Sequence, residues 1–253
     1  MKDCCIIIPI YNIKPVESEI KSISRTLSVL KDYDTYFIHP FLMDTSAYEE
    51  IIAYSVSDEI GRKLNVHFKP FRKKYFKSNK TYSRLMLSDQ FYRMFLEYEY
   101  MLIAQTDTYI LNTEHTLEEF IEISREKKYD YWGAPWTDGP FKKPYTLKDR
   151  FKLPVVKHPE QVKVGNGGFS LRHVSNTCNL VIRKKNLIDF YWRFNEDLFF
   201  SWFAIDPDNR YNAASFEEAL NFALEANMKK KKKKGNIPFA VHAWEKHYPD
   251  MQV

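Results

Sequence analysis

The hydrophobic residues of the N-terminal half alternate between short continuous runs and patterns with helical spacing. Residues 4–10 form a continuous, mostly apolar run, apolar residues then recur at helical spacing from Ile20 to Leu30, and residues 36–38 form a second short run. A strand that is apolar along its length is typical of a sheet covered by helices on both faces. The pattern therefore predicts a βαβ opening in an α/β protein with a mainly parallel central sheet.

The rest of the chain adds further elements without a repeat or a linker. The pattern predicts helices at residues 47–54, 82–95, 187–194 and 216–226, and strands at residues 66–68 and 100–104. With 253 residues, of which 44% are hydrophobic, the chain is long enough to bury one substantial core. We therefore predict a single domain over residues 1–253.

Composition narrows the class of protein. No stretch of 18 apolar residues could span a membrane, and the first apolar run is too short for a signal peptide, so we expect a cytoplasmic protein. The three cysteines, Cys4, Cys5 and Cys178, lack the spacing of a zinc site. Because the adjacent pair lies in an apolar strand, buried reduced thiols are expected.

The positive charge is concentrated in one place. The net charge of the protein is +5, and the run Lys229 to Lys234 supplies six positive charges. Without this run the chain is about neutral, which argues against a nucleic-acid partner. The run is typical of a solvated loop. Its functional alternative is peripheral contact with the inner face of an anionic membrane, or with a phosphate-bearing acceptor.

Two candidate features lie near strands. Asp107 follows the strand at residues 100–104, where open α/β sheets bind ligands, although an Asx turn would use the same residue. Gly165, Gly167 and Gly168 are three of only seven glycines and precede another strand-like segment. They would let the backbone approach a ligand and offer amide donors, or they would form a tight Asn-Gly turn.

Two more candidates lie in the C-terminal half. Glu196 and Asp197 are adjacent carboxylates in aromatic surroundings, which would raise a carboxyl pKa toward the range useful for a general base. The alternative is a helix N-terminus capped by Asn195. His242 lies in an apolar strand-like run, as a ligand or as a hydrogen-bonded core residue. Together with Asp107 it would suit Mn²⁺ or a similar divalent ion.

The order of these features resembles that of GT-A glycosyltransferases, in which an acidic metal-binding motif, a glycine loop, a Glu-Asp motif and a late histidine follow one another. The strings 129–136, 165–172, 195–201 and 238–246 closely resemble a bacterial GT-A family found in surface-polysaccharide loci. The resemblance implies a GT-A fold with a nucleotide-sugar-binding half at residues 1–112, continuous with an acceptor-binding and catalytic half at residues 113–253.

The resemblance also implies roles for single residues. The donor would be a nucleotide-diphosphate sugar, with a UDP-sugar favoured, and Mn²⁺ (or Mg²⁺) would be held by Asp107, His242 and the donor phosphates. Gln105 departs from the family, which has its first acid there. The expected donor contacts are Pro9, Tyr11, Asn12, Tyr82, Ser83, Gln105, Asp107, Gly167, Gly168 and Lys246.

From these roles we expect a single in-line displacement that inverts the anomeric carbon. Asp197 would take the proton of an acceptor hydroxyl, and Glu196 would position the acceptor or the loop, so that a hexose passes to a saccharide or a lipid-linked saccharide. The alternative is a nucleotidyltransferase or a nucleotide-sugar hydrolase, which would also place a metal on phosphates. The segment Pro9-Ile10-Tyr11-Asn12 lacks the glycine- and basic-rich loop that a nucleotidyltransferase would show.

Overall fold

The computed structural model describes residues 1–57, 64–111, 113–136, 162–190, 192, 194–225 and 237–248. Its centre is a six-stranded sheet made of β1 (Lys2–Pro9), β2 (Asp34–Pro40), β3 (Val66–Phe71), β4 (Tyr98–Ala104), β6 (Tyr131–Pro135) and β7 (Val164–His173). The strand order is β3-β2-β1-β4-β7-β6. Neighbours from β3 to β4 are parallel, and β7 is antiparallel to both β4 and β6. The predicted α/β fold with a mainly parallel sheet is confirmed.

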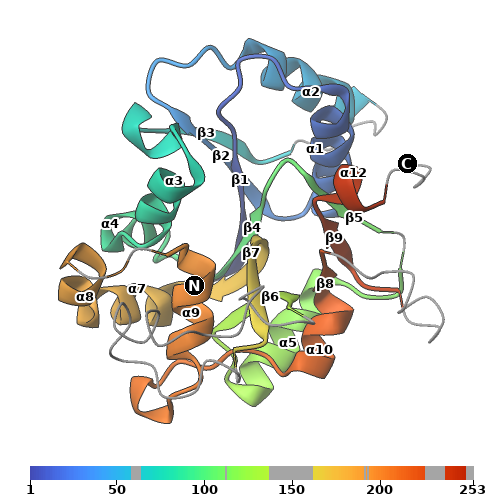
Figure 1. The fold of residues 1–253 in the computed structure, drawn as a ribbon. Helices are drawn as coiled ribbons and strands as arrows, with labels where there is room; N and C mark the ends of the chain where they lie inside the picture. Colours follow the sequence, from blue (N-terminus) through green and yellow to red (C-terminus); the bar gives the residue numbers. More distant parts are fainter. Residues whose placement is uncertain are drawn as a thin grey trace.

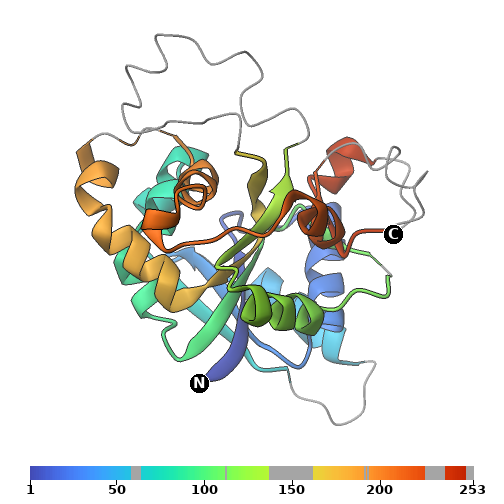
Figure 2. The same ribbon diagram turned by 90° about the horizontal axis from the view of Figure 1, so that it is seen from below.

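Helices cover both faces of the sheet (Figures 1 and 2). One face is covered by α1 (Glu17–Val29), α2 (Ser46–Ser57), α5 (Leu117–Lys127) and α10 (Phe216–Phe222). The other is covered by α3 (Asn79–Met86), α4 (Asp89–Arg93), α7 (Val174–Arg183), α8 (Lys185–Phe190) and α9 (Glu196–Phe203). The short helices η1 (Lys73–Phe76) and η3 (Pro207–Asn209) precede α3 and α10, and α12 (Trp244–His247) is the last element in the sequence.

Strand β1 shows why its sequence requires two helical layers. Cys5 and Ile7 pack into the core on the side of α3, α4, α7 and α9, whereas Ile6 and Ile8 pack against α1, α2 and α5. Successive side chains of a strand point to opposite faces, so an apolar run is fully buried only between two layers. All three cysteines are buried free thiols, as expected.

A second, three-stranded sheet joins the end of the chain to its middle. It contains β5 (Thr108–Ile110), β8 (Ala223–Leu224) and β9 (Ala240–His242) in the order β5-β9-β8. β5 is antiparallel to β9, and Thr108 is the register partner of His242. Because Asp107 immediately precedes Thr108, this register brings it to His242.

The strand order reverses between β1 and β4. From β1 the chain continues outward to β2 and then β3, while β4 lies on the other side of β1. The carboxyl ends of two such parallel strands leave a crevice between them. Pro9 ends β1 and Gln105 follows β4, so both residues border this crevice.

Some element predictions were wrong in detail. The helix predicted at residues 82–95 is two helices, because Ser88 is extended and begins α4. The glycine cluster lies within strand β7, not in a turn. Helix α7 was not predicted, although its buried apolar residues Val174, Cys178 and Val181 recur at helical spacing.

The lysine run from Lys229 to Lys234 lies outside the described residues, so the contact predicted for it is untested. Over the part of the chain that the structure describes, no helix is both long and apolar enough to cross a membrane.

Candidate active site

A cleft of about 460 Å³ opens at the reversal point of the sheet. The predicted donor- and metal-binding residues that line it are Pro9, Tyr11, Tyr82, Gln105, Asp107 and His242. The remaining lining comes from Glu19, Thr106, Phe76, Lys77, Ser78 and Asn79. Segments far apart in the sequence therefore meet where the strand order predicts a ligand site.

Asp107 and His242 lie against each other in this cleft. Asp107 Oδ1 is 3.3 Å from His242 Nε2, and Glu225 Oε1 is 3.8 Å from His242 Nδ1. The other carboxylate oxygen of Glu225 accepts a hydrogen bond of 3.0 Å from Asn166. Neither ring nitrogen of the buried His242 forms a well-aligned hydrogen bond within the described residues. Both nitrogens are thus buried, and each faces a carboxylate, Asp107 at Nε2 and Glu225 at Nδ1.

The two partners shift each other's pKa. Burial alone would raise the pKa of Asp107, but His242 outweighs it and the net shift is downward. Burial alone would lower the pKa of His242, but Asp107, then Glu225 and Asp197, outweigh it and the net shift is upward. Asp107 is therefore ionised near neutral pH, beside an imidazole that readily holds positive charge.

The pair fits a divalent cation that a ligand helps to hold. Oxygen and nitrogen ligands of one Mg²⁺-like ion lie about 3 Å apart when each is about 2.1 Å from the ion, and the Asp107–His242 separation of 3.3 Å is close to this. No group of three or more His, Cys, Asp or Glu suited to a metal occurs among the described residues. The chain would thus supply two ligands, and a bound phosphate and water would supply the rest.

The glycines of β7 pack against the candidate side chains. A Cβ on Gly168 would lie 2.1 Å from Nε2 of His242, and a Cβ on Gly167 would lie 3.1 Å from Oε1 of Glu196 and 3.2 Å from Cβ of Asp197. The pairing of β6 with β7 shifts here: Gly133 pairs with Ser170, whereas Ala134 pairs with Asn166. Such a bulge redirects side chains, and two glycines let His242 and the acidic pair approach one backbone segment.

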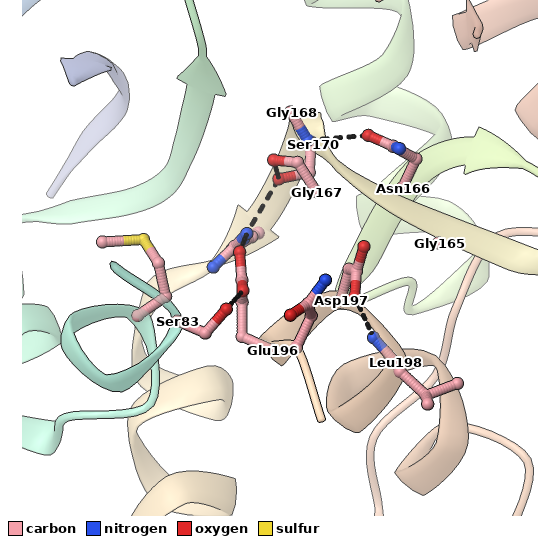
Figure 3. A network of polar contacts seen from close by, with 12 residues as sticks. Ser83, Gly165, Asn166, Gly167, Gly168, Ser170, Glu196, Asp197 and Leu198 are labelled. Carbon is pink, nitrogen blue, oxygen red and sulfur yellow. Dashed lines mark hydrogen bonds and ion pairs between the residues drawn. The ribbon is translucent and has the colours of Figure 1, made fainter. Parts of the chain in front are cut away.

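Glu196 is fixed by two partners from other elements (Figure 3). The hydroxyl of Ser83 on α3 donates a hydrogen bond to Glu196 Oε2. Arg172 Nη2 on β7 lies 3.8 Å from Glu196 Oε1, and both side chains are almost completely buried. Ser83 was predicted to contact the donor, but the structure places its hydroxyl on Glu196.

Arg172 is a buried cation that the sequence interpretation did not single out. Its Nε donates to Ser170 and its Nη1 to the Tyr92 hydroxyl, at 3.1 and 3.0 Å. Its guanidinium carbon lies 5.0 Å from the ring centroid of Phe200. Nη2 makes no hydrogen bond with the described residues, so its nearest compensation is the carboxylate of Glu196. A buried cation without a paired anion would be strongly destabilising.

Asp197 is a carboxyl with a raised pKa. Burial is the main cause that raises its pKa, the negative charge of Glu196 adds to it, and the pKa reaches about 7. The backbone N–H of Leu198 donates a 2.6 Å hydrogen bond to Asp197 Oδ1, visible in Figure 3, and holds the carboxyl in place. A pKa near the working pH is what proton transfer requires.

Several predicted residues lie away from the lining of the cleft. These are the predicted catalytic residues Glu196 and Asp197, and the predicted donor contacts Asn12, Ser83, Gly167, Gly168 and Lys246. Lys246 is exposed on α12. Asn195 precedes α9 as expected of a cap, but its side chain makes no capping hydrogen bond.

Among the residues at the site that were missed are Arg172, Lys77 and Glu225. Arg172 could have been found, because an arginine inside a predicted apolar strand needs a buried partner. Lys77 belongs to a basic segment that the sequence makes visible. Glu225 carries no local signal, since only the folded β8–β9 arrangement brings it to His242.

The architecture is that of GT-A-type glycosyltransferases. The fold resembles mouse xyloside xylosyltransferase 1 in its apo form, with a TM-score of 0.59 and 10% identity over 95% of this chain and 97% of that one. It also resembles the bifunctional glycosyltransferase WbbM, with a TM-score of 0.57 and 14% identity over 98% of this chain and 47% of that one. For the glycosyltransferase GlyE of Streptococcus pneumoniae TIGR4, in its apo form, the TM-score is 0.54 and the identity is 11% over 100% of this chain and 57% of that one.

The chain thus spans nearly all of the first protein but about half the length of the other two, and at these identities the likeness concerns the fold. The chain belongs to the family described as "Protein of unknown function (DUF5672)", whose model matches residues 65–242. No curated protein matches the sequence significantly.

Replacing Gly168 with Ala should displace the His242 ring, because the new methyl carbon would lie 2.1 Å from Nε2. We expect a lower unfolding temperature in a thermal melt. In the His242→Ala background the obstructing ring is absent. Gly168→Ala should therefore lower the unfolding temperature less in that background than in the unaltered chain. Additive losses in this double-mutant cycle would contradict the contact.

Replacing Asp197 with Asn should stabilise the protein more at pH 8 than at pH 5. The folded-state pKa of Asp197 is raised to about 7, so its stabilising contribution is complete below the unfolded pKa of about 4 and is lost as the pH rises through 7. The variant does not undergo this loss. The difference in free energy of unfolding between the variant and the unaltered protein should therefore be more favourable to the variant by roughly 1–3 kcal/mol at pH 8 than at pH 5. Chemical unfolding at both pH values measures this, and an equal effect at both would contradict the raised pKa.

Proposed function

We propose that this protein is a glycosyltransferase that transfers a sugar from a nucleotide-diphosphate sugar to a hydroxyl of a saccharide acceptor. The observation that carries the proposal is the arrangement around Gly167 and Gly168. The side chain of Asp197, whose carboxyl has a raised pKa, packs at the first glycine through its Cβ, and His242, paired with Asp107, packs at the second. A base poised near neutral pH and a place for a phosphate-bound cation are the two groups that this transfer needs.

The donor would occupy the cleft at the end of β1. Tyr11, which is 59% exposed at its rim, offers a ring face to a nucleotide base. The hydroxyl of Tyr82 is buried without a well-aligned hydrogen bond, and Lys77 adds a positive charge to the lining. Both suit the oxygens of a ribose or a diphosphate. We favour a UDP-sugar, with a hexose as the transferred group.

Asp107 and His242 would hold Mn²⁺ or Mg²⁺ together with the donor phosphates. When bound, such an ion neutralises the charge that develops on the departing diphosphate. Gln105 replaces the usual first acid, so the chain itself offers few ligands. Metal binding should therefore be strong only when the nucleotide is present.

Asp197 would take the proton of the attacking hydroxyl, and Glu196 would fix the position of the helix that carries it. Ser83 and Arg172 hold the Glu196 carboxylate, so Glu196 is not free to rotate toward another partner. A single displacement with Asp197 as base inverts the anomeric carbon. The acceptor would be a saccharide or a lipid-linked saccharide used in surface polysaccharide synthesis.

A nucleotide-sugar hydrolase is the competing activity, since it would use the same cation site with water as the acceptor. It would consume the donor at the same rate with or without an added saccharide. A transferase consumes it faster when the acceptor is present. Following nucleotide release in both conditions separates the two activities.

Asp197→Asn should lower kcat by about 10²- to 10⁴-fold, because the amide cannot accept the proton. The rate of the unaltered enzyme should rise with pH up to about 7, where Asp197 becomes ionised. The matched control is Asp189→Asn, an exposed carboxylate on α8 that pairs with Lys185, and its activity should be unchanged. NMR of the product should show an inverted anomeric centre; retention would contradict the role of Asp197 as base.

Nucleotide sugars should raise the unfolding temperature by mass action, and Mn²⁺ should increase the effect. A thermal-shift panel of nucleotide sugars, measured with Mn²⁺ or with a chelator, tests this and identifies the donor. His242→Gln should remove the additional Mn²⁺ effect and retain a weaker stabilisation by the nucleotide. Equal stabilisation with and without the chelator would contradict the cation site.

A further inference from the structure

A basic ridge runs along one side of the donor cleft. It comprises residues 72–80, which include η1 and the first residues of α3. From Lys69 to Arg84 the sequence contains seven lysines or arginines and no aspartate or glutamate. This local excess is larger than the net charge of the whole chain, which is +5.

The cations of the ridge are exposed and unpaired. Those exposed to solvent are Arg72, Lys73, Lys74, Lys77 and Lys80. None of them forms an ion pair with a carboxylate among the described residues; Lys74 instead lies over the ring of Tyr75, 5.0 Å from its centroid. Lys69 and Arg84, at the two ends of the segment, are engaged with the rings of Tyr36 and Phe95 and with backbone carbonyls of residues 188 and 192. The exposed five therefore have no carboxylate partner among the described residues that would neutralise their charge.

Apolar side chains project beside the ridge. Strands β2 and β3 end together with the pair Pro40–Phe71, and the N–H of Phe41 donates to the carbonyl of Phe71 at 2.7 Å. Phe41 and Leu42, which follow β2, therefore lie beside Arg72, which follows β3. Phe41 is 57% and Leu42 77% exposed. Leu42 has φ 62°, a backbone conformation that leucine rarely adopts.

The ridge also borders two hollows. Lys77 lines the donor cleft, whereas Lys74 and Lys80 line a groove of about 640 Å³ on the other side, which also contains Lys185 of α8. In Figure 1 the η1–α3 segment and the loop after β2 lie at the same end of the molecule, beyond the carboxyl ends of β1–β3. A partner held by this surface would lie next to the mouth of the cleft.

We infer that the ridge, together with Phe41 and Leu42, docks onto an anionic lipid bilayer. Each basic residue near an anionic leaflet increases binding by about fivefold, and exposed apolar side chains beside the charges can enter the boundary between headgroups and acyl chains. A soluble polyanion would use the cations but would leave Phe41 and Leu42 in water. Docking goes beyond the proposed transfer reaction, and it would place the cleft where a lipid-linked acceptor is available.

The full chain should bind vesicles of phosphatidylcholine mixed with phosphatidylglycerol, and should bind pure phosphatidylcholine vesicles much more weakly, in a flotation assay without donor. Lys73→Gln/Lys74→Gln should weaken binding by about 25-fold, since each charge contributes about fivefold. Phe41→Ser/Leu42→Asn should weaken it at both low and high salt, because apolar insertion is not screened. Asn suits the backbone of position 42 better than Leu.

Matched controls remove the same groups elsewhere. Lys21→Gln/Lys127→Gln takes two charges from α1 and α5, and Leu96→Asn removes an exposed leucine outside the ridge. These variants should bind as the unaltered chain does, and melts should show that all variants are folded. Equal binding to neutral vesicles, or full binding by Lys73→Gln/Lys74→Gln, would overturn the inference. So would heparin binding with no effect of Phe41→Ser/Leu42→Asn on vesicles, which would indicate a soluble polyanion.

Discussion

The charge of Arg172 inside the core is the constraint on which the site depends. The guanidinium is fully buried, and Tyr92, Ser170 and the ring of Phe200 do not neutralise it. It therefore requires the carboxylate of Glu196, which brings the start of α9 against β7. The placement of Asp197 follows, because it is the next residue of the same helix.

The same contact sets the chemistry of Asp197. Burial in the layer between α9 and β7 is the main cause of its raised pKa, and the neighbouring charge of Glu196 adds to it. The N–H of Leu198 and then Arg172 oppose the shift, and together they limit it to the range where a carboxyl exchanges protons near neutral pH. The buried pair therefore does more than hold α9, since it also adjusts the group that the helix presents.

Sequence periodicity predicts the layers of this protein because each strand and helix buries residues that its own local pattern reveals. The continuous apolar run of β1 was sufficient to predict a sheet covered by helices on both faces. Helix boundaries were less accurate, since the break at Ser88 depends on a single extended residue inside a continuous helical pattern. Of the site, Asp107 and His242 could be paired from their order in the chain, whereas the contact of Glu225 with His242 depends on the register of β8 and β9, which no local pattern encodes.

Electrostatics link the cleft to the ridge beside it. The cleft lining contains two carboxylates, Glu19 and Asp107, one lysine, Lys77, and His242, so the proposed diphosphate would be repelled by the ionised Asp107 unless a cation lay between them. Glu19 is already engaged by Thr106 and by the N–H of Val16. The cations of residues 72–80 raise the local concentration of anions at the cleft mouth but lie mostly outside it. Under the proposed function, attraction of an anionic donor and neutralisation of its phosphates would therefore be separate tasks, and the second would fall to a divalent ion held by Asp107 and His242.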